Sequence, residues 1–147
     1  RIELCWDPDR NAFYGEGQLA TLSQAKLLWL SEDHRALRRA SQDVLMELLS
    51  GKLPFEKQQT VASLDGARFM LSFIRDVLTY HESGAINENP DRADDIRAIS
   101  SRFTTGRINC IIEWLVSAME RLDTNASAAG TFTRLFTEIT EEFIHND

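Results

Sequence analysis

Glycine, proline and cysteine are scarce in this 147-residue sequence, which has seven Gly, three Pro and two Cys. So few glycines and prolines exclude collagen-like chains and low-complexity linkers. Two cysteines, Cys5 and Cys110, are too few for a disulfide framework or a four-thiolate zinc site. We expect both to be reduced core residues, and one disulfide between them remains the alternative. No run approaches the roughly 20 apolar residues that a membrane-spanning helix needs.

Positive charge is also in short supply, since 16 Lys and Arg stand against 23 Asp and Glu, for a net charge of −7. A surface of this sign gains little from phosphate neutralisation, so direct nucleic-acid binding is not expected. The 43% of hydrophobic residues predicts one globular domain with a single core. The N-terminus lacks both an initiator Met and the anatomy of a signal peptide, which favours a cytoplasmic fragment or processed chain.

Signatures of catalysis are lacking as well. The sequence contains no GxxxxGK[ST], HExxH, GxSxG or glycine-rich dinucleotide motif. One ExxH step, Glu142 to His145, falls short of the two steps that a di-iron bundle needs, and we interpret it as a solvated helix end. Three acids, Asp91, Asp94 and Asp95, lack calcium-loop spacing and are typical of a first helical turn. We therefore expect no catalytic residue, metal, cofactor or small-molecule ligand.

Helical patterning dominates from Gln18 onward, whereas residues 1–17 are interpreted as an irregular lead-in or the stub of a preceding domain. We expect no strand. The predicted helices are Ser23–Leu30, a helix capped by Ser31 and ended by Gly51 after Leu49, an uncertain segment over 54–63, Gly66–Glu82 capped by Asp65, Pro90–Ser101, Thr105–Leu122 and Ala128–Ile144. Residues 18–147 thus form one helical domain, an all-α bundle of about six helices.

The last two helices have the clearest apolar stripes, at alternating spacings of three and four residues. They consist of Ile108, Ile111, Ile112, Leu115, Met119 and Leu122, and of Phe132, Leu135, Phe136, Ile139 and Phe143. The short turn between them predicts an antiparallel pair. Arg121, Asp123, Asn125 and Ser127 are the predicted turn and cap residues, and Ser127 fits best as the cap of the second helix.

Arginines supply the candidate interaction surface. Arg35, Arg38 and Arg39 form a basic stripe that could contact a phosphate backbone or an acidic partner. Alternatively, they belong to a solvated helix face that also carries acids such as Glu32 and Asp43. The solvated face is the favoured interpretation. Arg107 is added as a possible partner contact, and Arg92 and Asp95 are expected to be exposed, with Ile96 and Ile99 inward.

One stretch, "RFTTGRINCIIEWLVSAMERLDTNASAAGTFTRLFTEITEEF", resembles the C-terminal collar domain of the delta-prime subunit of the bacterial DNA polymerase III clamp loader. In that family a helix that begins at Ser or Thr ends in Arg-Leu. An Asn follows after two intervening residues, and a final amphipathic helix comes next. The counterparts here are Thr104 or Thr105, Arg121-Leu122 and Asn125. Two upstream segments, around Ala25 and around Arg75-Asp76, are also similar, so the resemblance covers roughly residues 18–144.

The resemblance implies that the chain helps to hold a pentameric clamp loader together by helix-to-helix contacts during DNA replication. AAA+ modules elsewhere in the assembly bind ATP and open the sliding clamp. The implied partners are the delta and gamma/tau subunits, and the gamma/tau collar is the nearest alternative identity. An unrelated helical adaptor or regulatory domain is the alternative of a different class.

Overall fold

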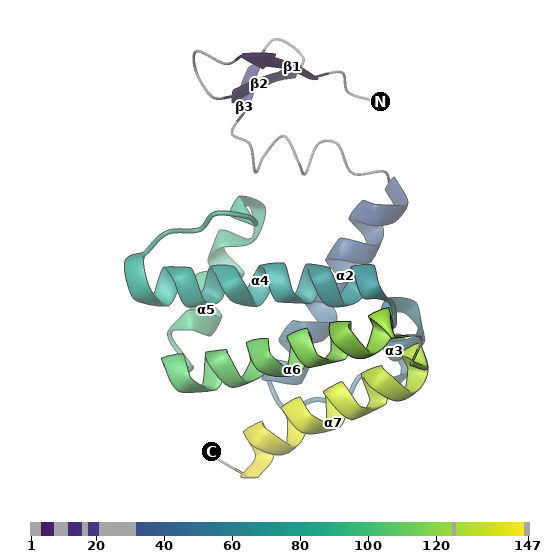
Figure 1. Ribbon diagram of the computed structural model, residues 1–147. Helices are drawn as coiled ribbons and strands as arrows, with labels where there is room; N and C mark the ends of the chain where they lie inside the picture. Colours follow the sequence, from purple (N-terminus) through teal and green to yellow (C-terminus); the bar gives the residue numbers. More distant parts are fainter. Residues whose placement is uncertain (1–3, 8–11, 16–17, 21–31, 125, 146–147) are drawn as a thin grey trace.

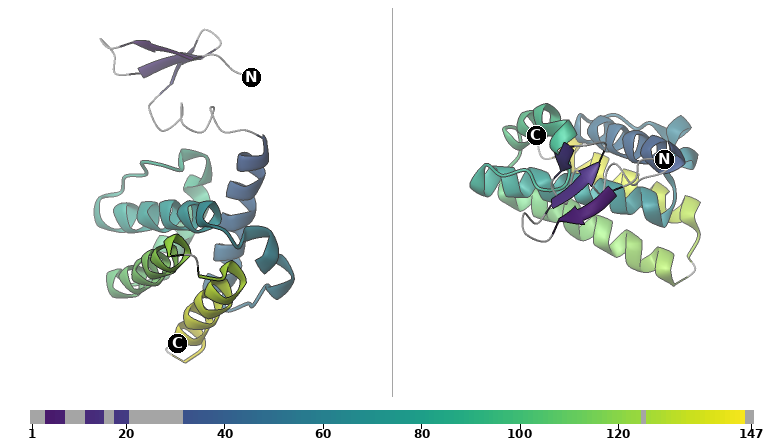
Figure 2. Two further views of the ribbon diagram at one scale, coloured as in Figure 1. Left: turned by 45° about the vertical axis from the view of Figure 1, so that its right-hand side comes forward. Right: turned by 90° about the horizontal axis from the view of Figure 1, so that it is seen from above.

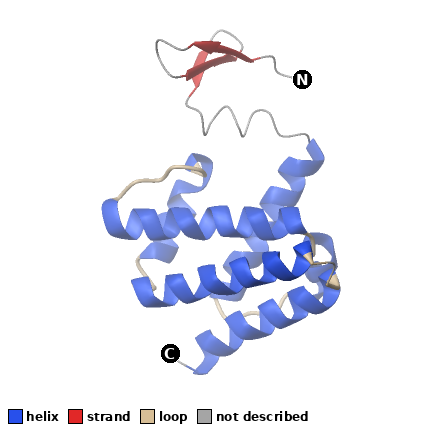
Figure 3. Ribbon diagram, in the orientation of Figure 1, coloured by secondary structure: helices blue, strands red, loops and turns tan. Residues whose placement is uncertain are grey.

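The computed structural model describes residues 4–7, 12–15, 18–20, 32–124 and 126–145. Six α-helices and one small sheet lie in this part of the chain (Figures 1 and 3). The helices are α2 (Glu32–Leu49), α3 (Phe55–Val61), α4 (Leu64–Ser83), α5 (Ala93–Ser100), α6 (Thr105–Asp123) and α7 (Ala128–His145), with a 3-10 turn, η1 (Pro90–Arg92), before α5. The predicted helical bundle is confirmed. The predicted helix Ser23–Leu30 lies outside the described residues, and so does Ser31, the predicted N-cap of α2.

The first 20 residues differ from the prediction, because they contain strands. Strands β1 (Leu4–Asp7), β2 (Ala12–Gly15) and β3 (Gln18–Ala20) form an antiparallel sheet in the order β1-β2-β3. Cys5 pairs with Tyr14, which pairs in turn with Leu19. Each strand is only three or four residues long and lacks clear alternation of apolar and polar residues, so the period-2 signal is missing. The expectation of no strand was therefore wrong for the described residues in this part of the chain, and the interpretation of residues 1–17 as a lead-in or as the stub of a preceding domain stays a prediction.

Helix α4 is the centre of the helical body and contacts α2, α5 and α6 (Figures 1 and 2). Met70, Phe73, Ile74 and Val77 are fully buried along it. Because its apolar residues cover more than one face, the helix can pack on several sides, as its sequence predicts. Its predicted N-cap needs correction: Ser63, not Asp65, accepts the hydrogen bond from the backbone N–H of Gly66, at 3.0 Å.

Helices α6 and α7 run antiparallel and in contact, with α6 between α4 and α7 (Figure 1). The predicted stripes form their inner faces: Ile108, Ile111, Leu115, Phe132, Leu135, Phe136 and Ile139 are buried, and Ile112, Met119 and Leu122 are half-buried. The rings of Phe132 and Phe136 meet edge to face, with centroids 6.2 Å apart. Apolar burial at helical spacing therefore fixes this pair.

Two glycines in the left-handed region end α2 and α4, Gly51 with φ 86° and Gly84 with φ 76°. At Gly51, the N–H of Lys52 donates to the carbonyl of Glu47 and the N–H of Gly51 donates to Leu48, both at 3.0 Å. These are the two bonds of a Schellman motif, in which glycine avoids the Cβ clash of a positive φ. The predicted stop at Gly51 is confirmed, and the chain leaves α2 in one defined direction.

Candidate functional site

A buried polar cluster joins α2, α4 and the loop before η1. Arg38 donates to Asp91 through both terminal nitrogens, at 2.8 and 2.7 Å, and to Oδ1 of Asn89 at 2.8 Å. Gln42, one turn further along α2, donates to the same oxygen of Asn89 at 3.0 Å and to the carbonyl of Phe69. Arg38, Gln42 and Asn89 are all buried. We call these residues, with Asp76 and Asp91, the polar clasp.

The carboxylate of Asp76, on α4, binds the backbone of the irregular loop between α4 and η1. Its carboxylate accepts hydrogen bonds from the backbone N–H groups of Asn87, Glu88 and Asn89, the shortest of them 2.6 Å from Asn89. It also accepts one from the side-chain amide of Asn89, at 3.0 Å. Asp76 is 1% exposed. A buried carboxylate is tolerated in such a place because N–H donors replace the water that it loses.

The acids of the η1–α5 turn bind three separate arginines. Asp91 pairs with Arg38, and the other two pair with arginines of their own turn: Asp94 with Arg97 at 3.1 Å and Asp95 with Arg92 at 3.2 Å. Asp94 and Asp95 also lie in the first turn of α5, where the helix dipole favours acids. These carboxylates therefore have cationic partners inside the molecule.

The surroundings of Asp91 perturb the pKa of its carboxyl group. Partial burial by itself raises the pKa of its carboxyl, but the hydrogen bonds and the positive charge of Arg38 lower it by more. The net effect is a pKa below the ordinary value of 3.8. The pair is therefore charged near neutral pH and ties α2 to η1.

The predicted arginine stripe divides into two kinds of residue. Arg35 and Arg39 are exposed and Arg107 is half-buried, whereas the Arg38 side chain is 11% exposed and occupied by Asp91 and Asn89. Arg38 therefore cannot belong to a solvent-facing stripe. The sequence held a signal for this, because Arg38 and Gln42 continue the helical spacing of buried Leu45 and Leu49 toward the N-terminus.

Arg92 was also predicted to be exposed, and this is wrong. Its side chain is 12% exposed, lies over the ring of Phe73 at 5.6 Å, and donates to Asp43 at 2.6 Å and to Asp95 at 3.2 Å. Aromatic stacking and two carboxylates compensate its partial desolvation. Half-exposed Asp95 and buried Ile96 and Ile99 lie as predicted on the two faces of α5.

An open groove of about 450 Å³ lies between α2 and α5, and the first turn of α3 borders it. Met46, Ala98 and Ile99 supply its apolar lining. Charged and polar residues line the rest: Asp43, Glu47, Ser50, Lys57, Asp95 and Arg102. Lys57 donates to Glu47 at 2.7 Å, and this hydrogen bond and the charge of Glu47 raise the pKa of Lys57. We call this feature the α2–α5 groove.

The turn between α6 and α7 is fixed by its own hydrogen bonds. The carbonyl of Arg121 accepts from the N–H groups of Thr124 and Ala126, both at 3.1 Å. Ser127 Oγ accepts from the N–H of Gly130 at 3.2 Å, as the predicted cap requires. At the other end of α6, Thr104 is the cap, and its hydroxyl accepts from Arg107 at 3.3 Å. Asp123 is exposed at the end of α6, and Asn125 lies outside the described residues.

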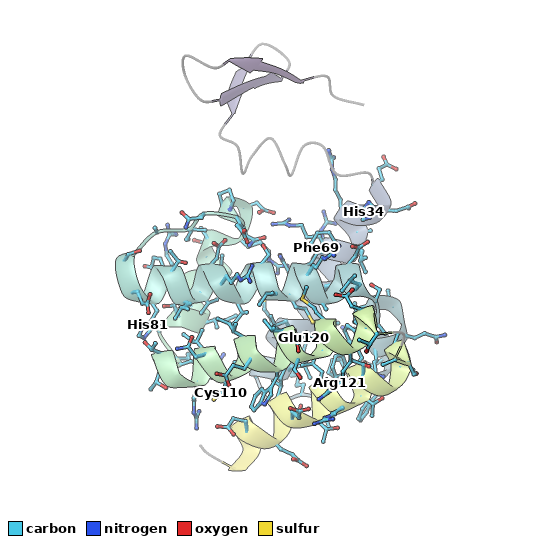
Figure 4. All side chains as sticks on the ribbon, viewed as in Figure 1. His34, Phe69, His81, Cys110, Glu120 and Arg121 are labelled. Atoms are coloured by element: carbon cyan, nitrogen blue, oxygen red, sulfur yellow. The ribbon has the colours of Figure 1, made fainter. Side chains whose placement is uncertain are left out.

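The histidines and the described cysteine lie apart from one another in the described part of the chain. Figure 4 shows His34, His81 and Cys110 on three different helices. His34 pairs with Asp65 at 3.4 Å, and His81 Nδ1 lies 3.3 Å from the hydroxyl of Thr105. No group of three metal-ligating side chains occurs in the described residues. Cys110 is a free cysteine, half-buried and not part of the core, so its predicted core position is wrong and its reduced state stays a prediction.

Comparison with known proteins adds no relative: no protein-family model, curated protein or solved structure matches this chain. Nor does any described helix combine the length and apolarity that crossing a membrane requires. The function is therefore inferred from the residues and contacts described above, together with the resemblance of the sequence to a clamp-loader collar.

Proposed function

We propose that this chain is the collar domain of a clamp-loader subunit, similar to delta-prime, and that it acts by assembling subunits. One observation carries the proposal: the stretch that resembles the family, residues 102–143, folds largely as an antiparallel pair of helices in contact. The cap at Thr104 and the Arg121-Leu122 pair in the last turn of α6 support the proposal. Ser127 caps α7 at a position where members of that family often have a second Asn, and the counterpart Asn125 lies outside the described residues. The gamma/tau collar is the nearest alternative.

A collar has to present stable helix faces to its neighbours, and two features suit the domain to this task. The polar clasp ties α2, α4 and the η1 turn together by charge-assisted hydrogen bonds, which resist shear between helices. On α6, the side chains of Ile112, Val116 and Met119, at one edge of its inner face, are only half covered by the domain itself. A neighbouring helix that covered them would add apolar burial.

Co-expression with the delta and gamma/tau subunits of the same organism tests the proposal. We expect the chain to co-elute with them in size-exclusion chromatography at micromolar concentration. The predicted contacts Arg39 and Arg107 should matter to this complex, so charge reversal of both, Arg39→Glu with Arg107→Glu, should weaken it. Arg97→Glu is the matched control, because Arg97 is an exposed arginine outside the predicted interface.

Two outcomes would contradict the proposal. A chain that elutes without delta and gamma/tau under all conditions has no collar role and belongs with helical adaptors of another class. Likewise, the coding sequence upstream of Arg1 should specify an AAA+ module, and its absence there would count decisively against a clamp loader.

A further inference from the structure

We draw no further inference here: the strongest candidate, the exposed apolar side chains of Leu53 and Phe55 in the connection between α2 and α3, beside the α2–α5 groove, carries none because nothing in the described part of the structure shows what covers them.

Discussion

Two regions of the helical body are built from different interactions. Where α6 meets α7, buried Phe, Leu and Ile side chains at helical spacing form a continuous apolar contact. Where α2 and α4 meet the η1 turn, the contact is the polar clasp, with Asp76 and Asn89 buried to 99%. Apolar packing tolerates small shifts of the helices. In a buried polar cluster, every group left without a hydrogen-bond partner lowers the free energy of unfolding. The first region supplies stability, and the second specifies one arrangement of the helices.

Removal of a central ring from the apolar region should have the largest effect. Phe136→Ala should lower the free energy of unfolding by about 3–5 kcal/mol, since the ring is fully buried and its neighbours cannot fill the cavity. Urea denaturation followed by circular dichroism measures this change. Thr137→Ala, at the exposed next position, should alter the free energy by much less. Equal losses for the two variants would mean that α7 does not pack through Phe136.

Asp76→Ala removes the central acceptor of the polar clasp. It should lower the free energy of unfolding by roughly 3 kcal/mol, the upper end of what a hydrogen bond to a charged group contributes. The N–H groups of Asn87, Glu88 and Asn89 would lose their acceptor together. Asp76→Asn keeps one carbonyl acceptor in place and should recover part of the loss. The same urea titration measures both variants. If Asp76→Ala were as stable as the unsubstituted chain, the loop would not depend on this carboxylate.

How far the sequence predicts the structure depends on the kind of interaction. The pair α6–α7 is predictable, because an apolar residue every three or four positions indicates both a helix and its inner face. The clasp is not, because Arg38 and Asn89 lie 51 positions apart and only the folded chain brings their side chains together. Charged residues are also normally exposed, so Arg38 and Arg92 were assigned to the surface. The short β-strands were missed because their pairing, and not their local pattern, defines them.

The candidate site was predicted even less completely than the fold. Composition and periodicity indicate the exposed or half-exposed arginines Arg35, Arg39 and Arg107, but not that Leu53 and Phe55 are exposed. In the sequence these two residues look like ordinary core positions. Their exposure follows from the direction in which Gly51 and Pro54 send the chain after α2. Turn geometry of this kind is a property of the folded backbone.

The cap of α7 offers an intermediate test on the apolar side. Ser127→Ala removes the acceptor of the Gly130 N–H and should lower the free energy of unfolding by about 1 kcal/mol. Thermal denaturation followed by circular dichroism is sufficient to detect it. Ser83→Ala is the matched control, because Ser83 is equally exposed and its hydroxyl only donates within α4. A Ser127 variant no less stable than the Ser83 variant would show that the turn does not need this cap.

The smallest effect concerns Asp91, at the exposed edge of the polar clasp. A carboxyl whose pKa is lowered by folding stabilises the protein above its unfolded pKa, and this contribution is lost as the pH falls through the folded pKa. The stability of the unsubstituted chain should therefore decline below about pH 4. Asp91→Asn should flatten that decline and cost less than about 1 kcal/mol at neutral pH, since solvent screens a half-exposed pair. Urea midpoints measured from acid to neutral pH give both quantities, and parallel curves would contradict the assignment.

The grip of Asp76 on the loop before η1 has a consequence for the local motion of the chain. Backbone amides of irregular loops normally exchange their hydrogens with solvent quickly, because nothing has to unfold first. The amides of Asn87, Glu88 and Asn89 are instead bonded to a carboxylate buried in α4. They should exchange on the slow time scale of α4 itself. This loop would then open together with the central helix, as one cooperative unit.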